Sequence, residues 1–208
     1  MSAVEQQPEQ PLCVHFVNTV DRHGIDSGND CFSDFEGFLT WTGTAELLPK
    51  AQRQRWSHWG ERHRSEANRF LDSLVTFREY LYDLLLKSAL AQRVNPSKLA
   101  ELNAMLSTPD YRRSLHLHDD EIAEEWECGE GLTAVLRRVA LSAADVLLND
   151  TWRKIVNCSR DDCDWVAIDT SRNHSRRYCT SNGCGNRERV QRHYRRHRAD
   201  GTSPRRAV

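Results

Sequence analysis

Four of the seven cysteines stand in two close pairs near the end of the chain, and this pattern constrains the fold more than any other feature. The spacing is Cys158-x4-Cys163-x15-Cys179-x4-Cys184. Two pairs joined by a loop suit a tetrahedral Zn²⁺, because each pair spans one edge of the tetrahedron. Four thiolates leave no coordination position open, so we expect one structural zinc ion and no catalytic metal.

The scarcity of large apolar side chains around these cysteines also favours a metal. Residues 153–208 offer few of them, mainly in the segments 155–156 and 165–168. So few cannot offset the conformational entropy of ordering the segment, whereas a structural zinc contributes about 10–16 kcal/mol. Three alternatives stay open at this stage: a mixed site that borrows His193 and His197, an iron–sulfur cluster, and disulfides.

The formal net charge of -1 hides an asymmetry between the two parts of the chain. Residues 1–152 hold 15 Lys and Arg against 24 Asp and Glu, whereas residues 153–208 hold 14 against 6. Lys154 is the only lysine of the basic part. Because the planar fork of arginine matches phosphate and guanine edges, this composition indicates a nucleic-acid partner.

Two basic stretches flank the second cysteine pair. Residues 185–198, GNRERVQRHYRRHR, predict a helix on which Val190 and Tyr194 share one side, and we expect both to pack on the zinc unit. The arginines on the rest of this helix repel one another unless an anion is bound. Residues 171–177, SRNHSRR, supply further groups that bind phosphate oxygens or read bases.

The acidic part shows mostly helical periodicity. A capping box at 33–36 opens a short helix that Gly43 ends, and an apolar stripe from Ser65 to Leu90 predicts a long amphipathic helix. Asn95 and Pro96 begin another helix, and Gly131 precedes the last one. Residues 12–20 are read as helix, whereas the changed period over 111–127 predicts a β-hairpin.

These patterns predict a mainly α fold in two parts. Residues 1–152 would form a helical domain with a β-hairpin. Residues 153–208 would form a small four-cysteine zinc finger with a basic C-terminal helix. The N-terminus lacks the basic and apolar regions of a secretory signal, and no apolar run reaches membrane-spanning length. We therefore expect a cytoplasmic, nucleoid-associated protein with no membrane contact.

Residues 163–187, CDWVAIDTSRNHSRRYCTSNGCGNR, resemble the CGNR zinc finger family, whose name is the tetrapeptide at 184–187. Upstream, FVNTV at 16–20, LNAML at 102–106 and LSAADVLL at 141–148 resemble the helical ABATE domain. The resemblance implies a bacterial stress-induced transcription regulator, in which a domain sensing an unidentified small-molecule effector precedes a DNA-binding finger. By position, it also implies that the four cysteines are the zinc ligands.

The chemistry of the basic stretches and the family resemblance both predict DNA contacts in the finger. The sequence also departs from the family pattern at two positions. Ala167 replaces a common aromatic, which thins the packing of the finger, and His15 replaces a common acid, which weakens any ligand chemistry assigned to that acid. The candidate DNA-binding residues are Arg172, Arg176, Arg177, Asn186, Arg187, Arg189, Arg192, Arg195 and Arg196.

We expect a zinc-finger DNA-binding regulator and not an enzyme, because no nucleophile elbow, phosphate-cradling glycine loop or paired carboxylates occur in the sequence. Alternatives are a zinc module that binds RNA or an acidic protein partner, and an enzyme in the helical domain. A homodimer is an open alternative to a monomer.

The isolated Cys13, Cys31 and Cys128 are read as core residues, with redox sensing as the rival. The cluster at 56–63 is read as helix surface.

Overall fold

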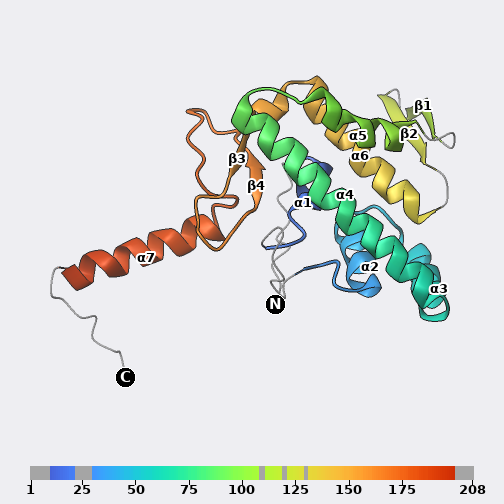
Figure 1. Cartoon of the computed structure of the whole chain (residues 1–208), viewed down its shortest axis with the longest axis horizontal. Coiled ribbons are helices and arrows are strands. Elements are labelled where there is room, and N and C mark those ends of the chain that lie inside the picture. Colours follow the sequence, from blue (N-terminus) through green and yellow to red (C-terminus); the bar gives the residue numbers. More distant parts are fainter. Residues whose placement is uncertain (1–9, 22–29, 108–110, 119–120, 129–130, 200–208) are drawn as a thin grey trace.

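The helices of the N-terminal part pack around one long central helix (Figure 1). The computed structural model describes residues 10–21, 30–107, 111–118, 121–128 and 131–199, with the backbone alone for 111–118, 121–128 and 197–199. The central helix is α4 (Arg64–Ala91). The helices that contact it along its length are α1 (Leu12–Val17), α2 (Phe35–Thr44) and α3 (Lys50–Arg62). Two further helices, α5 (Leu99–Leu106) and α6 (Leu132–Leu148), pack against each other, and α6 also packs against α1.

Two antiparallel hairpins interrupt the helical order. In the first, β1 (Tyr111–His118) pairs with β2 (Glu121–Cys128). A 3-10 turn at Thr151–Lys154 leads from α6 into the second, where β3 (Ile155–Asn157) pairs with β4 (Val166–Ile168). The chain then reaches the last helix, α7 (Cys184–Ala199). This order confirms the mainly α fold with a hairpin and a C-terminal helix.

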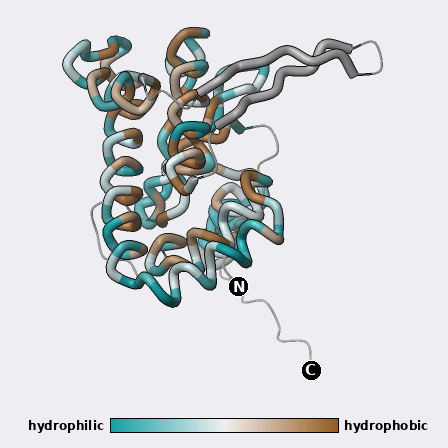
Figure 2. Tube along the Cα trace, turned by 90° about the vertical axis from the view of Figure 1, so that its right-hand side faces the viewer, coloured by the Kyte–Doolittle hydropathy of each residue, from teal (hydrophilic) through white to brown (hydrophobic). Residues whose placement is uncertain are grey.

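The predicted helices occur, and two of the predicted start signals lie at the residue before a helix. Asn95 accepts a hydrogen bond from the Ser97 amide at 3.1 Å, which starts a 3-10 turn at Pro96–Lys98 that runs into α5. Gly131 is the N-cap of α6. Hydrophobic residues recur between hydrophilic ones along the helices (Figure 2), as expected where one side of each helix faces the core. No helix in the described ranges is long and apolar enough to cross a bilayer.

Three local predictions differ from the structure. The N-cap of α2 is Asp34, which accepts from the Gly37 amide at 2.7 Å, so the capping box at 33–36 is wrong by one residue. The helix ends at Thr44 instead of Gly43. The predicted apolar stripe of α4 includes Leu90, but this residue is 76% exposed, because at about 100° per residue it points away from the side that buries Leu81 and Leu85.

One core runs from the helical part into the C-terminal hairpin. Its centre is aromatic: the Phe16 ring lies 5.6 Å from Phe32, 5.6 Å from Trp41 and 5.9 Å from Phe77. The same cluster takes in Trp152, Ile155, Val166 and Ile168. Here α4 contacts β3 and α1 contacts β4. The second hairpin is therefore built onto the helical domain and does not hang from a free linker.

A buried arginine fixes the segment that follows α1. Arg78 in α4 has only 3% of its side chain exposed and grips both carboxylate oxygens of Asp30, at 2.6 and 2.7 Å. It also contacts the Thr19 hydroxyl at 3.3 Å, and the Cys31 amide donates to the Thr19 carbonyl at 2.9 Å. These bonds attach residues 18–21 to the central helix.

Candidate metal centre and nucleic-acid interface

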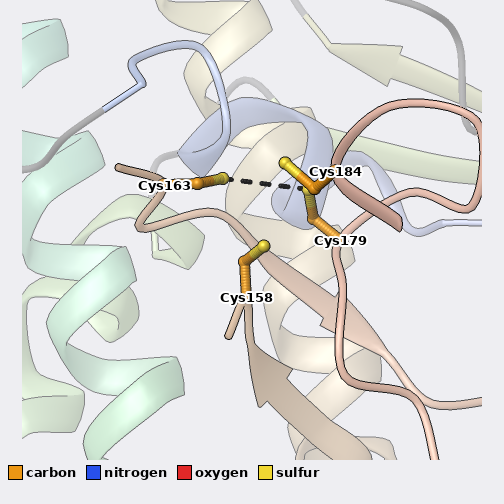
Figure 3. Close-up of side chains that lie close together, drawn as sticks. All are labelled: Cys158, Cys163, Cys179 and Cys184. Carbon is orange, nitrogen blue, oxygen red and sulfur yellow. Dashed lines mark hydrogen bonds between the residues drawn. The ribbon is translucent and has the colours of Figure 1, made fainter. Parts of the chain in front are cut away.

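The four paired cysteines converge on one point (Figure 3). Their sulfur atoms all lie within 4.8 Å of one another, and the Cys163 and Cys179 sulfurs are 3.8 Å apart. Zinc–sulfur bonds of about 2.3 Å in a tetrahedron put neighbouring sulfurs about 3.8 Å apart. All four side chains are buried, and Trp165 and Tyr178 pack against them. The cluster therefore has the donors and spacing of a structural zinc site.

The second hairpin positions the first pair of ligands. Cys158 directly follows β3, and its amide donates to the Trp165 carbonyl at 2.8 Å, so the hairpin hydrogen bonding continues up to the ligand. The Cys163 amide closes the loop on the Arg160 carbonyl at 3.2 Å. Within this loop Arg160 grips both carboxylate oxygens of Asp162 at 2.7 Å. The loop thus holds its shape through its own contacts.

The start of α7 positions the second pair. Cys184 is the first residue of the helix, and the next amide, of Gly185, donates to the Thr180 carbonyl at 2.9 Å. A Cβ atom on Gly185 would lie 3.1 Å from that carbonyl oxygen, so the helix could not approach the loop as closely with a larger residue. The Gly183 amide donates to the Thr180 hydroxyl at 3.0 Å. The glycines therefore let α7 begin at the metal.

The acid–base properties of the thiols fit a cation site. Hydrogen bonds from the thiols of Cys163 and Cys179 lower the pKa of Cys158 to about 2. The hydrogen bonds to the Cys158 sulfur raise the pKa of Cys163 and raise the pKa of Cys179 to about 12, and burial and repulsion between neighbouring thiolates add to the rise. A divalent cation removes that repulsion and stabilises all four thiolates. With four sulfur ligands, it has no position left for a reacting water.

Asp169 organises the basic stretch at 171–177. Its carboxylate accepts from the Ser171 amide at 2.9 Å, the Ser171 hydroxyl at 2.5 Å and the Arg176 amide at 3.0 Å. Burial raises the pKa of Asp169, but these hydrogen bonds outweigh it and the pKa lies below the usual value. The Ser159 amide donates to the Arg177 carbonyl at 2.8 Å, which fixes the stretch against the first ligand loop.

The predicted DNA-binding residues fall into two groups by their contacts. Arg176 donates to the Cys179 carbonyl at 3.1 Å, and Arg189 donates to the Ser181 carbonyl at 3.1 Å and the Gly185 carbonyl at 3.4 Å. These two guanidinium groups support the ligand loops. Arg189 is nevertheless exposed, whereas Arg176 is half-buried. The remaining candidates are exposed and make no such contact to a ligand loop within the described residues; they are Arg172, Arg177, Asn186, Arg187, Arg192, Arg195 and Arg196.

The prediction that Val190 and Tyr194 pack on the zinc unit is wrong. Their exposed fractions are 46% and 57%, because α7 leaves the body of the molecule after its first turn (Figure 1). Every residue from 191 to 196 is exposed. His193 is among them and is not part of the sulfur cluster, and the side chain of His197 lies outside the described part.

Sequence reasoning missed the residues that attach the finger to the helical domain. The side-chain amide of Asn18 donates to the Val166 carbonyl at 2.8 Å and accepts from the Val166 amide at 2.9 Å. Gln10 makes the same pair of bonds with Ile168, at 3.4 and 2.7 Å. Together they satisfy the edge of β4 that faces away from β3, in place of a third strand. Asn18 lies in the FVNTV segment, but nothing in that segment indicates that its side chain binds the backbone of Val166.

The remaining sequence candidates have structural roles or lie outside the description. Burial raises the pKa of Cys13 to about 12 and also raises the pKa of Cys31, so both thiols stay protonated, which does not favour redox sensing. The side chain of Cys128 lies outside the described residues. The cluster at 56–63 is helix surface only in part: His58, Glu61, Arg62 and His63 are exposed, whereas Gly60 is buried and Trp56 and Trp59 pack half-buried against the core. His15 is half-buried on α1.

Comparisons with known proteins agree with this architecture. The family model of the CGNR zinc finger matches residues 154–197. The model of the ABATE family, described as "Putative stress-induced transcription regulator", matches residues 10–150. No match was found among curated proteins. Because the second match covers well over half of the 208 residues, and the four cysteines of the first are gathered in a structural zinc site, the chain belongs to the ABATE family and carries a CGNR zinc finger at its C-terminal end.

Proposed function

We propose that this protein is a DNA-binding transcription regulator whose zinc finger contacts duplex DNA. The observation that carries the proposal is the placement of α7. The helix begins at the zinc ligand Cys184 and then projects from the body with its arginines exposed. At 16 residues it is about 24 Å long, which is enough to cross a DNA groove.

The charge of the finger supports a polyanionic partner. Residues 153–208 carry 14 Lys and Arg against 6 Asp and Glu, a net of +8. Zinc with four thiolates adds about -2, which leaves about +6 on the loaded finger. The rest of the chain carries a net of -9, so the helical domain itself repels DNA and leaves the contact to the finger.

The helical domain is proposed to regulate this contact, and no chemical reaction is assigned to the chain. A zinc ion held by four cysteines lacks the open position that hydrolytic zinc enzymes use. The docking of β4 onto α1 gives a route by which a change in the helical domain reaches the finger. The small-molecule effector of that domain stays a prediction.

A salt titration of the metal-loaded protein tests the proposal. If the finger neutralises about 4–5 phosphates, the logarithm of affinity for a duplex should fall with the logarithm of salt concentration at a slope near -4. Removal of zinc by a chelator should abolish binding, and stoichiometric zinc should restore it. A slope close to zero, or binding that survives zinc removal, contradicts the proposal.

Two controls separate the alternatives. Arg55→Ala removes an exposed arginine from α3, far from the finger in sequence, and should leave DNA affinity unchanged. Structured RNA and an acidic polypeptide serve as competitors against the labelled duplex. Displacement of the duplex by either one at lower concentration than by unlabelled duplex would assign the finger to that partner instead.

A further inference from the structure

The α7 helix has two chemically different sides. Residues spaced by three, four and seven share one side of a helix. One side, here called the groove face, carries Asn186, Arg187, Val190, His193 and Tyr194. The opposite side, here called the back face, carries Glu188, Arg192 and Arg195. Arg189 and Arg196 lie on the border between the two.

The groove face exposes apolar surface that no described part of the chain covers. Val190 is 46% exposed and Tyr194 is 57% exposed, although both stand on a helix that begins at Cys184 of the sulfur cluster. The Tyr194 ring meets His193 edge-on, with centroids 6.1 Å apart. Large apolar side chains exposed side by side typically mark a binding surface.

Charge decides which partner covers this surface. Helix α7 carries six arginines against one glutamate, a net of +5. A second copy of the helix would bring the same charge against it, while two apolar residues bury far less area than a stable dimer needs. A polyanion, by contrast, is attracted by arginines on both borders of the face, Arg187 on one side and Arg196 on the other.

The residue types on the two sides also differ in what they recognise. Asparagine pairs with adenine edges, arginine with guanine edges, and apolar side chains contact the thymine methyl group. The back face instead holds the one acid of the helix, Glu188, whose carboxylate lies 3.9 Å from Arg192. An acid placed toward phosphates would weaken binding, and the Glu188 side chain is only 23% exposed, so the back face is the less suited side for DNA.

We propose that α7 lies in the major groove of B-form DNA with its groove face toward the base pairs, so that Asn186, Val190 and Tyr194 determine sequence specificity. The inference rests on the proposed DNA-binding function and adds the orientation of the helix. A helix about 10–12 Å wide fits a major groove about 12 Å wide only when no neighbouring element blocks it. The exposure of residues 191–196 meets that requirement. Arg187 and Arg196 then reach phosphates on the two walls.

Two arginine variants on the same helix test the orientation. Arg196→Ala and Arg192→Ala remove the same charge, but only Arg196 borders the groove face. Arg192 and Arg195 are among the arginines that the sequence predicts to contact DNA, and the proposed orientation instead turns them away from it. Arg196→Ala should therefore weaken binding to every duplex and reduce the salt slope by about 1, whereas Arg192→Ala should change affinity by less than about twofold. Equal or larger losses from Arg192→Ala and Arg195→Ala would put the back face on DNA and overturn the proposal.

Selection of preferred DNA sequences tests whether side chains of the groove face determine sequence specificity. Duplexes selected from a random library by the wild-type, zinc-loaded protein are compared with a scrambled duplex. Asn186→Ala and Tyr194→Ala should each reduce the preference for the selected duplex about tenfold, whereas Gln191→Ala, an exposed neighbour outside the groove face, should preserve it. Unchanged preference in both reading variants overturns the proposal. The zinc content of each variant, measured first, confirms an intact finger.

The same experiments distinguish the two levels of inference. If the wild-type protein binds no duplex, the proposed function fails and the orientation fails with it. If the wild-type protein binds duplexes and the face variants contradict the expected pattern, only the orientation fails. The oligomeric state, measured by sedimentation without DNA, tests the remaining alternative. A wild-type dimer that becomes a monomer in Tyr194→Ala would assign the groove face to a second copy of the chain and overturn the proposal.

Discussion

Asn18 and Val166 are joined by two hydrogen bonds across 148 residues of sequence. The side-chain amide of Asn18 meets both the N–H and the C=O of Val166, which is how a neighbouring strand would bind it. Val166 is fully buried, so no water replaces these bonds if they are lost. A single side chain of the helical domain therefore supplies two of the hydrogen bonds at the junction that joins it to the zinc finger.

Replacement of Asn18 by alanine should destabilise the whole chain. The change leaves the buried N–H and C=O of Val166 without their partner, which costs about 2–4 kcal/mol in the free energy of unfolding. Chemical denaturation followed by circular dichroism measures the loss. Asn103→Ala, at an exposed position of α5, is the matched control and should stay within about 0.5 kcal/mol. Equal stability of the two variants would show that the junction is dispensable.

Zinc removal should lower the thermal stability of the helical domain as well as that of the finger. Val166 and Ile168 belong to the same core as Phe16 and Leu81, so loosening of the hairpin exposes part of that core. A loss of about 2 kcal/mol corresponds to a fall of about 4–8 °C in Tm for a chain of this size. Calorimetry with and without chelator measures the shift, and Cys158→Ala should reproduce it without chelator. If the Tm of the helical domain is the same with and without zinc, the shared core is contradicted.

Gly185→Ala should weaken zinc binding about tenfold, since groups beside a ligand affect metal affinity by 10–100-fold. Its Cβ would lie 3.1 Å from the Thr180 carbonyl oxygen, and that backbone is held by the neighbouring ligand Cys179. Competition with a chromophoric chelator measures the affinity. Gly131→Ala is the matched control, because its nearest neighbour, the Thr133 hydroxyl, lies at an ordinary 3.4 Å. Equal zinc affinity in both variants would contradict the steric explanation.

Arg176 and Arg172 should behave differently although both belong to the basic stretch. The Arg176 guanidinium supports the Cys179 carbonyl, so Arg176→Ala should weaken zinc binding before it affects DNA binding. Arg172 is exposed, and Arg172→Ala should retain zinc fully and lower only the affinity for DNA. Parallel zinc and DNA titrations check the pair. Full zinc affinity in Arg176→Ala would place both arginines in the same role.

The sequence reveals the zinc ligands and the helices because their signals are local. The two cysteine pairs and the Asn95–Pro96 start need only a few neighbouring residues to be recognised. The capping box placed at 33–36 is wrong by one residue because Ser33 and Asp34 accept the same kind of hydrogen bond, so the residue type does not tell which of them caps the helix. The spacing of Val190 and Tyr194 correctly predicts that they share one side of a helix, but a helical pattern does not tell which surface, if any, covers that side. Asn18 and Gln10 pair with backbone groups, which every residue has, so no sequence signal marks their partners.

Arg78 should affect the zinc site from a distance, through the segment at residues 18–21. Arg78 holds Asp30 and Thr19 from α4, while the Val20 carbonyl accepts from the Trp165 indole at 2.8 Å and the Asp21 carbonyl from the Asp164 amide at 3.2 Å. Arg78→Leu leaves the Asp30 carboxylate, whose side chain is 25% exposed, without its ion-pair partner and should cost about 2–3 kcal/mol in stability. It should also speed zinc loss to a chelator, although Arg78 is no ligand. Arg69→Leu, on the same helix but 72% exposed, should do neither. Unchanged zinc release in a destabilised Arg78→Leu protein would show that residues 18–21 do not couple the helical domain to the metal.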